Sequence, residues 1–177
     1  IYRVRTNELH AAADGKGKVN CVAFGVADGL AVAETNGENQ PAGWRGPDGV
    51  LWFPSPVGVV RVDPASAPSN EMPPPVMIEE ARTESLVLVD DTGRNPVLNR
   101  GGDALRIPPG NARVLEFHYT AGSFAAPERV RFRHRLIGHE TAWVEAGARR
   151  VAYYTNLRPG RYRFEVTACN NHGVWAV

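Results

Sequence analysis

Arginine recurs at every second position of one short segment of the chain. The run begins at Arg129 and ends at Arg135, and apolar or aromatic side chains and one histidine fill the positions between. Because successive side chains of a β-strand point to opposite faces of a sheet, this alternation predicts a strand with one buried and one solvent-facing side. If the strand expected at 161–168 lies beside it, one arginine face carries Arg129, Arg131, Arg133, Arg135, Arg161 and Arg163.

Two interpretations of this arginine face stay open. In the first it is a solvated surface, with Glu165, Glu116 or Glu145 as partial counterions. In the second it is a docking face for an acidic partner, a twin subunit or anionic lipid headgroups. The net charge of the whole chain is only +1, so its composition gives no reason to expect nucleic acid as a partner.

Aromatic side chains are the second group that could bind a ligand. Tyr153, Tyr154 and Trp143 could form a stacking platform for a sugar ring, which makes a carbohydrate-binding sandwich module the alternative function. Such a platform needs two coplanar exposed rings. The competing interpretation exposes only one of Tyr153 and Tyr154. It gives packing roles to the other rings, with the tyrosine hydroxyls at the rim of the core: Tyr119, Tyr162, Trp143 and Trp175.

Residue types of catalytic and metal sites occur without the spacing that such sites need. His118 and His134 could form a metal-binding or pH-sensing pair, but no third ligand accompanies them, so we expect no metal and no cofactor. Alternation along the strands predicts a buried, hydrogen-bonded His134 and a solvent-facing His118. Glu79 and Glu80 are adjacent on a strand and therefore point to opposite faces. No nucleophile, phosphate-loop or zinc-protease motif occurs, so we expect no enzyme activity in this chain.

Composition favours a turn-rich β protein. The 177 residues include 18 glycines and 14 prolines, and no apolar run is long enough to cross a bilayer. The first residues already read as a strand, which indicates a piece of a longer chain. Cys21 and Cys169 fall in different modules. A disulfide between them could form in an oxidising compartment, but two separate thiols are favoured.

Short strands separated by turns are predicted throughout, and no helix, because no apolar series at 3.6-residue spacing persists beyond two turns. Residues 90–102 read as a polar loop or a loose hairpin. The last strand follows a Pro159-Gly160 turn and carries Tyr162, whose hydroxyl can bond to upstream backbone like the corner tyrosine of an immunoglobulin-like sandwich. The strands are expected at 1–5, 19–26, 30–33, 50–53, 59–62, 76–81, 85–89, 104–107, 113–119, 129–136, 142–145, 150–154 and 161–168.

The predicted fold class is all-β: a fibronectin- or immunoglobulin-like β-sandwich preceded by a partial β-propeller blade. Residues 1–64 are expected to be the last blade, since short strands with Asp-Gly turns and a tryptophan, Trp52, are what a blade requires. Residues 65–75 form a linker in which three consecutive prolines favour stiff, extended backbone. Residues 76–177 form the sandwich. Without its neighbours, the blade is expected to pack on the sandwich or on another copy.

The sandwich segment resembles the three-tyrosine (Y_Y_Y) domain that ends the two-component regulator propellers of bacterial sensor proteins. The matching pieces are PERVRFRHRLIG, TAWVEAG, YYTNLRPGRYRFEV and ACNNHGVW. The segment before it, from DGVLWFP to GVVRVDP, resembles the repeat of those propellers, as does IYRVRTNEL at the start. His134 stands where the family usually has a tyrosine, and the acidic position after the Leu136-Ile137-Gly138 turn is shifted, to Glu140.

This resemblance implies the periplasmic, extracytoplasmic part of an inner-membrane signalling receptor. Its role would be to relay a ligand-induced change from the propeller toward the membrane. The implied partners are the rest of the propeller, a cytoplasmic output domain (commonly a histidine kinase) and a second copy in a homodimer. An oligosaccharide would bind at the missing part of the propeller.

Overall fold

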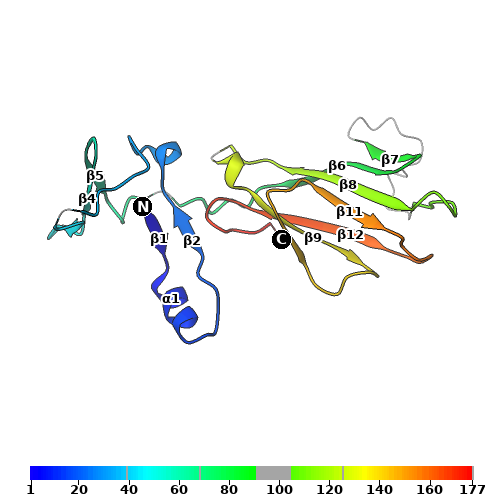
Figure 1. Ribbon diagram of the computed structural model, residues 1–177, viewed down its shortest axis with the longest axis horizontal. Helices are drawn as coiled ribbons and strands as arrows, with labels where there is room; N and C mark the ends of the chain where they lie inside the picture. The colour runs from blue at the N-terminus through cyan, green and yellow to red at the C-terminus, as the bar shows by residue number, and fades with distance from the viewer. Residues whose placement is uncertain (39, 68, 91–104, 125, 177) are drawn as a thin grey trace. The chain divides into compact units, whose positions relative to one another are not determined.

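The computed structural model describes residues 1–38, 40–67, 69–90, 105–124 and 126–176. The chain divides into two compact units, residues 1–71 and 72–177 (Figure 1). The division falls inside the segment expected to be a linker, 65–75. All but the first residue of the loop expected at 90–102 lies outside the described residues.

Unit 1 begins with an element that the sequence analysis missed. β1 (Tyr2–Val4) and β2 (Cys21–Ala23) pair antiparallel, and α1 (Thr6–Ala13) lies between them, so the expectation of a chain without helices is wrong. The helix ends in three consecutive alanines, the best helix formers, and Gly15 follows with a φ of 71°. None of its residues is buried. It presents no apolar stripe at a spacing of 3.6 residues, which is the sequence pattern by which an amphipathic helix is predicted.

The second part of unit 1 is a three-stranded antiparallel meander. β3 (Trp44–Arg45), β4 (Leu51–Ser55) and β5 (Gly58–Val62) pair in that order, and Trp52 lies opposite Trp44. The expected Asp-Gly turn is present, because Asp48 Oδ1 accepts the amide of Val50 at 3.1 Å and Gly49 has a φ of 84°. The strand expected at 30–33 is wrong, since those residues follow a 3₁₀ turn, η1 (Val26–Asp28), without forming a strand.

Unit 2 is a sandwich of two antiparallel sheets (Figure 1). One sheet has the order β11-β8-β6-β7, and the other has the order β10-β9-β12. Together with the small sheets of unit 1, this arrangement confirms the predicted fold class. The strands are β6 (Val76–Thr83), β7 (Val87–Asp90), β8 (Val114–Ala121), β9 (Arg131–Ile137), β10 (Val144–Gly147), β11 (Val151–Thr155) and β12 (Arg163–Cys169).

Three expectations for unit 2 need correction. The strand expected at 104–107 does not form, as residues 105–107 carry no strand. Arg129 lies in a 3₁₀ turn, η2 (Pro127–Arg129), because the proline at its start sets the backbone for a helical turn. Arg161 precedes β12 instead of lying in it. The arginine strand itself, β9, forms as the alternation predicts.

Large side chains from both sheets meet in the core of the sandwich. Tyr119 of β8 and Phe132 and Leu136 of β9 are at most 1% exposed. Phe117 of β8 stacks on Phe164 of β12, with ring centroids 3.9 Å apart and planes at 2°, so this contact joins the two sheets directly. Along β9 the buried residues alternate with arginines, which explains how one strand carries both core and charge.

The corner tyrosine closes the turn before β12. Tyr162 donates its hydroxyl hydrogen to the carbonyl of Arg158 at 2.7 Å, as expected, although the residue is half-buried and not a core residue. Its ring lies against Gly138, whose φ is 97°. A Cβ at that position would come within 2.7 Å of the Arg161 carbonyl oxygen, so the Leu136-Ile137-Gly138 turn requires its glycine.

Replacing Tyr162 by phenylalanine should lower the free energy of unfolding by about 1 kcal/mol, because the Arg158 carbonyl loses its donor in a partly solvated place. Urea denaturation measures the effect. Tyr153→Phe is the matched control, since this ring is 62% exposed, and its effect should stay within about 0.5 kcal/mol. Equal losses in the two variants would refute the structural role of the corner bond.

Candidate functional site

The arginine face forms on the outer side of the β10-β9-β12 sheet, but its charges do not oppose one another. β9 and β12 pair antiparallel, as expected, with Arg135 opposite Glu165 and Arg133 opposite Thr167. Arg163 lies opposite Ile137. Arginines of the two strands are therefore not directly opposite each other, since the register pairs each arginine with an acidic or neutral residue.

Glu165 is the counterion at the centre of this face. Arg135 donates from Nε to Glu165 Oε2 at 2.7 Å, and Arg163 Nη2 lies 2.9 Å from Glu165 Oε1. The hydrogen bond from Arg135 is the main cause of a lowered pKa of the Glu165 carboxyl, and the charges of Arg135 and Arg163 act in the same direction. One carboxylate thus offsets two guanidinium groups.

Two tryptophans hold the guanidinium groups of β9 in place. Arg133 Cζ lies 4.3 Å from the ring centroid of Trp175 and 5.0 Å from that of Trp143, and Arg135 Cζ lies 4.5 Å from that of Trp143. These are cation–π distances. Arg133 Nε is buried and has no hydrogen-bond partner within the described part of the chain. Trp143 and Trp175 therefore pack against arginines and do not form an open sugar platform.

The other arginines of the face project their charge outward. Arg131 and Arg161 are exposed, and the Arg163 side chain keeps 72% of its surface accessible. Arg129 sits beside Glu128, with 3.7 Å between Arg129 Nε and Glu128 Oε1. The solvent-facing part of the arginine face is thus Arg131, Arg161 and Arg163, while Arg133 and Arg135 are used within the sheet surface.

A chain of polar groups crosses the core beneath this face. Tyr154 is 5% exposed and donates its hydroxyl hydrogen to Glu140 Oε2 at 3.0 Å. The Tyr154 oxygen is then left to accept from Nδ1–H of His134, 2.9 Å away, which defines the tautomer of this buried imidazole. Glu140 Oε2 also accepts the amide of Leu136 at 2.7 Å, so the carboxylate fixes the end of β9 as well.

Burial governs the titration of this polar chain. It lowers the pKa of His134 from 6.5, against the opposing attraction of Glu140, and Arg149 lowers it further. Burial first, and then the hydrogen bond to Glu140, raises the pKa of Tyr154 far above 10. Tyr119 is fully buried, so its pKa is raised to about 12, and its hydroxyl has no partner among the described residues. The expectation that its hydroxyl lies at the rim is wrong.

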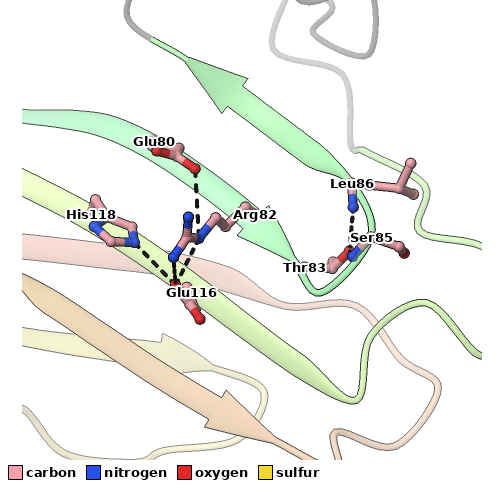
Figure 2. A network of polar contacts seen from close by, with 7 residues as sticks. All are labelled: Glu80, Arg82, Thr83, Ser85, Leu86, Glu116 and His118. Atoms are coloured by element: carbon pink, nitrogen blue, oxygen red, sulfur yellow. Dashed lines mark hydrogen bonds and ion pairs between the residues drawn. The ribbon is translucent and has the colours of Figure 1, made fainter.

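The opposite face of the sandwich carries a second polar cluster (Figure 2). Glu116 of β8 accepts hydrogen bonds from Arg82 Nε at 2.8 Å and lies 3.2 Å from His118 Nε2, while Glu80 Oε1 is 3.6 Å from Arg82. The bond from Arg82 and then that from His118 lower the pKa of Glu116. His118 points to the outer side of the sheet, as alternation predicts, and its side chain is 27% exposed because it lies against Glu116.

A shallow depression lies beside this cluster. It has a volume of about 430 Å³ and is lined by residues 82–87 and Glu116. The turn at its rim is built by Thr83, whose Oγ1 accepts the amide of Leu86 at 3.1 Å (Figure 2). Tyr153, opposite Glu116 in the register, is the exposed member of the Tyr153/Tyr154 pair. No local sequence pattern predicts this cluster, because its residues are close only through the pairing of β6 with β8.

The residues that could bind a metal are dispersed. His134 points into the core from β9, whereas His118 lies on the outer surface of the other sheet. Among the described residues no group of three His, Cys, Asp or Glu side chains could hold a metal ion. Cys21 is an exposed free thiol and Cys169 a buried one. In the same part of the chain, no helix is both long and apolar enough to cross a membrane.

Comparisons with known proteins agree with this architecture. Residues 123–177 match the family model of the Y_Y_Y domain. No curated protein matches the chain. A similar solved structure is the extracellular domain of BT3049 from B. thetaiotaomicron, described as a hybrid two-component system, with 17% identity, a TM-score of 0.57 and 92% of this chain covered. Another is the extracellular domain of BT4673 from the same organism, described as a one-component system, with 16% identity, a TM-score of 0.40 and 72% of this chain covered.

This chain spans only about a fifth of each of those two chains, 21% and 17% of their lengths. The likeness to the first extends over both units of the present chain and concerns the fold. The Y_Y_Y match covers β9 to β12 and the arginine face.

The buried histidine should make the stability of the chain depend on pH. Because the pKa of His134 is lower in the folded state than the ordinary 6.5, the unfolded chain binds more protons between the two values, and stability rises with pH there. We therefore expect the free energy of unfolding to fall as the pH drops through 6.5, as measured by urea denaturation at a series of pH values.

His134→Gln should remove this slope, whereas His118→Gln should retain it. The pKa values of the Glu116 and Glu165 carboxyls are lowered from 4.5, so their contribution to the free energy of unfolding is lost only below pH 4.5. They therefore do not produce the change in stability that begins near pH 6.5. An unchanged slope in His134→Gln would show that another group is responsible.

Proposed function

We propose that this chain is an extracytoplasmic relay region of a bacterial two-component or related signalling receptor. It passes a ligand-induced change from a propeller toward the membrane. The observation that carries the proposal is the Y_Y_Y match over residues 123–177, which include β9 to β12 of unit 2. The fold likeness to the extracellular domain of a protein described as a two-component system supports it.

The construction of unit 2 suits a relay that acts as a stiff body. Its two sheets interlock through Phe117 and Phe164, and protein interiors packed in this way transmit displacement with little compression. The segment before β6 contains Pro73, Pro74 and Pro75, and the carbonyl of Pro75 accepts the amide of Gly122 at 3.0 Å. A proline-stiffened segment anchored in this way can move the sandwich when it moves.

The proposal assigns no catalysis to this chain. Any histidine kinase or other output domain would belong to the cytoplasmic part of the parent receptor, and the oligosaccharide ligand would bind the remainder of the propeller. The receptor would lie in the inner membrane with this region in the periplasm, as a homodimer. No nucleic acid takes part.

A carbohydrate-binding sandwich is the weaker candidate. It requires two coplanar exposed rings, but Tyr154 is 5% exposed and Trp143 lies under the guanidinium groups of Arg133 and Arg135. Tyr153 is exposed on the opposite face of the sandwich, away from Trp143. No specific observation therefore favours this function.

Insertion of Gly-Ser-Gly-Ser after Ser66 of the intact receptor should abolish most ligand-driven output, because a flexible coil absorbs displacement. Transcription from a target promoter is measured with and without a polysaccharide that activates the wild-type receptor. Insertion of four prolines at the same place is the matched control and should preserve more of the response, since this spacer is semi-rigid. A full response with the flexible insertion would refute the relay.

We further propose that the outward arginines dock against a twin subunit. Arg131→Glu combined with Arg163→Glu should weaken dimerisation and ligand-driven output, because both side chains are exposed and neither takes part in the tryptophan stack. Analytical ultracentrifugation and the promoter assay measure the two effects. Arg150→Glu with Arg158→Glu makes the same change in charge outside the face and should leave both unchanged. If dimerisation and output are unchanged in the Arg131→Glu, Arg163→Glu variant, the arginine face is a solvated surface and not a docking face.

A further inference from the structure

A buried asparagine shapes the turn by which the chain leaves β12. Asn170 is 1% exposed and follows directly after the strand. Its side-chain Oδ1 accepts hydrogen bonds from the backbone N–H groups of His172 at 2.9 Å and Val174 at 3.0 Å. The backbone N–H of Asn170 donates to the Val174 carbonyl at 3.1 Å. Gly173, with a φ of 77°, completes the turn. One side chain thus fixes the geometry of residues 170–174, here called the trailing turn.

The other end of the same side chain holds the start of unit 2. Asn170 Nδ2 donates to the carbonyl of Met72 at 2.9 Å, across 98 positions of sequence. Met72 begins the segment 72–75, here called the leading segment, which runs into β6. Figure 1 shows the chain entering β6 and the turn after β12 at the same end of unit 2. The leading segment and the trailing turn are therefore joined by the side-chain amide of Asn170.

Asparagine is the residue type that this arrangement requires. The site needs two acceptor positions and one donor on a short side chain at a buried location. Aspartate keeps the acceptor oxygens but has no hydrogen for the Met72 carbonyl, and serine is too short to reach both sides. Because the amide is buried, a lost bond leaves a carbonyl without its donor, and such groups are costly to leave unpaired.

The trailing turn is also tied to the sheet beyond Asn170. The amide of Ala176 donates to the Ala168 carbonyl at 2.8 Å, and Thr167 Oγ1 donates to the Ala176 carbonyl at 2.7 Å. Trp175 bridges to Cys169 and stacks on Arg133. The outgoing chain is therefore clamped to β9 and β12, and through Asn170 it is clamped to the incoming chain as well.

We propose that Asn170 is the mechanical coupling of unit 2. A displacement of the leading segment at Met72 passes through the Asn170 side chain to the trailing turn, and from there along residues 174–176 to Trp175 and Arg133. The proposal rests on the relay function and names the residue through which the relay acts. Its direct consequence is that a perturbation of the trailing turn is felt less strongly at Met72 when the side-chain amide of Asn170 is removed.

A spin label at position 72 tests this coupling in the chain itself. Met72 is 77% exposed, so Met72→Cys accepts the label while the backbone carbonyl stays in place. Cys21, which is exposed, is replaced by serine, and the buried Cys169 is left unlabelled. The rotational correlation time of the label is then measured by electron paramagnetic resonance in the background of Trp175→Ala, Asn170→Asp and both together.

With Asn170 present, Trp175→Ala should shorten the correlation time roughly two-fold or more, and in the Asn170→Asp background its further effect should be clearly smaller. Trp143→Ala is the matched control. It removes the other indole that lies over Arg133 but leaves the trailing turn in place, so the label should not respond. Thermal unfolding confirms that each variant is folded, and Asn170→Ser replaces Asn170→Asp if the buried carboxylate prevents folding.

Two results would overturn the coupling. One is a label that ignores Trp175→Ala while Asn170 is present, and the other is an equal response to Trp175→Ala with and without the amide. Neither depends on signalling, so failure of the coupling is distinguishable from failure of the relay. A relay that fails the linker insertion test would leave the label measurements unaffected.

Discussion

The antiparallel pairing of β9 with β12 is the constraint on which the rest of unit 2 depends. Its register puts Glu165 beside Arg135, and Ala168 beside Phe132. The first pair faces solvent and the second faces the core, so a single ladder sets both surfaces. The same strand, β12, ends at Cys169 and thereby determines where Asn170 and the turn after it begin.

Several charges of unit 2 are balanced by nearby groups. Arg135 and Arg163 both pair with the carboxylate of Glu165, and Arg133 lies between two indole rings. On the other sheet, Arg82 forms ion pairs with Glu116 and Glu80. Each of these groups is at least partly exposed, so the ion pairs contribute more to the orientation of side chains than to stability. What they provide is two sheet surfaces whose side chains keep defined positions.

Sequence patterns predicted the strands well where one face is buried and the other wet. Arg129–Leu136 was recognised within about two residues, and so was the strand that follows Tyr162, because alternation with period two is a strong local signal. α1 was not predicted, because none of its residues is buried and its sequence carries no periodic apolar stripe. The strand expected at 104–107 failed because a short apolar stretch does not reveal whether a neighbour is available for pairing.

The candidate site was harder to predict than the fold. The roles of Glu140, Asn170 and Glu116 arise from contacts between strands that are distant in sequence, which no local pattern encodes. Glu140 was visible only as an acidic position shifted from the family's usual place, and Asn170 only as part of the matching piece ACNNHGVW. The tryptophans and arginines were noticed separately, but their stacking follows from the register of β9.

The strict alternation of β9 also bears on how the protein avoids folding incorrectly. If β9 paired with a shift of one residue, Arg131, Arg133 and Arg135 would turn inward, and Phe132 and Leu136 would turn toward water. An unpaired buried guanidinium is among the costliest groups that a protein interior can hold. The arginines therefore select against wrong registers, because every pairing of β9 that is shifted by an odd number of residues would bury three charges.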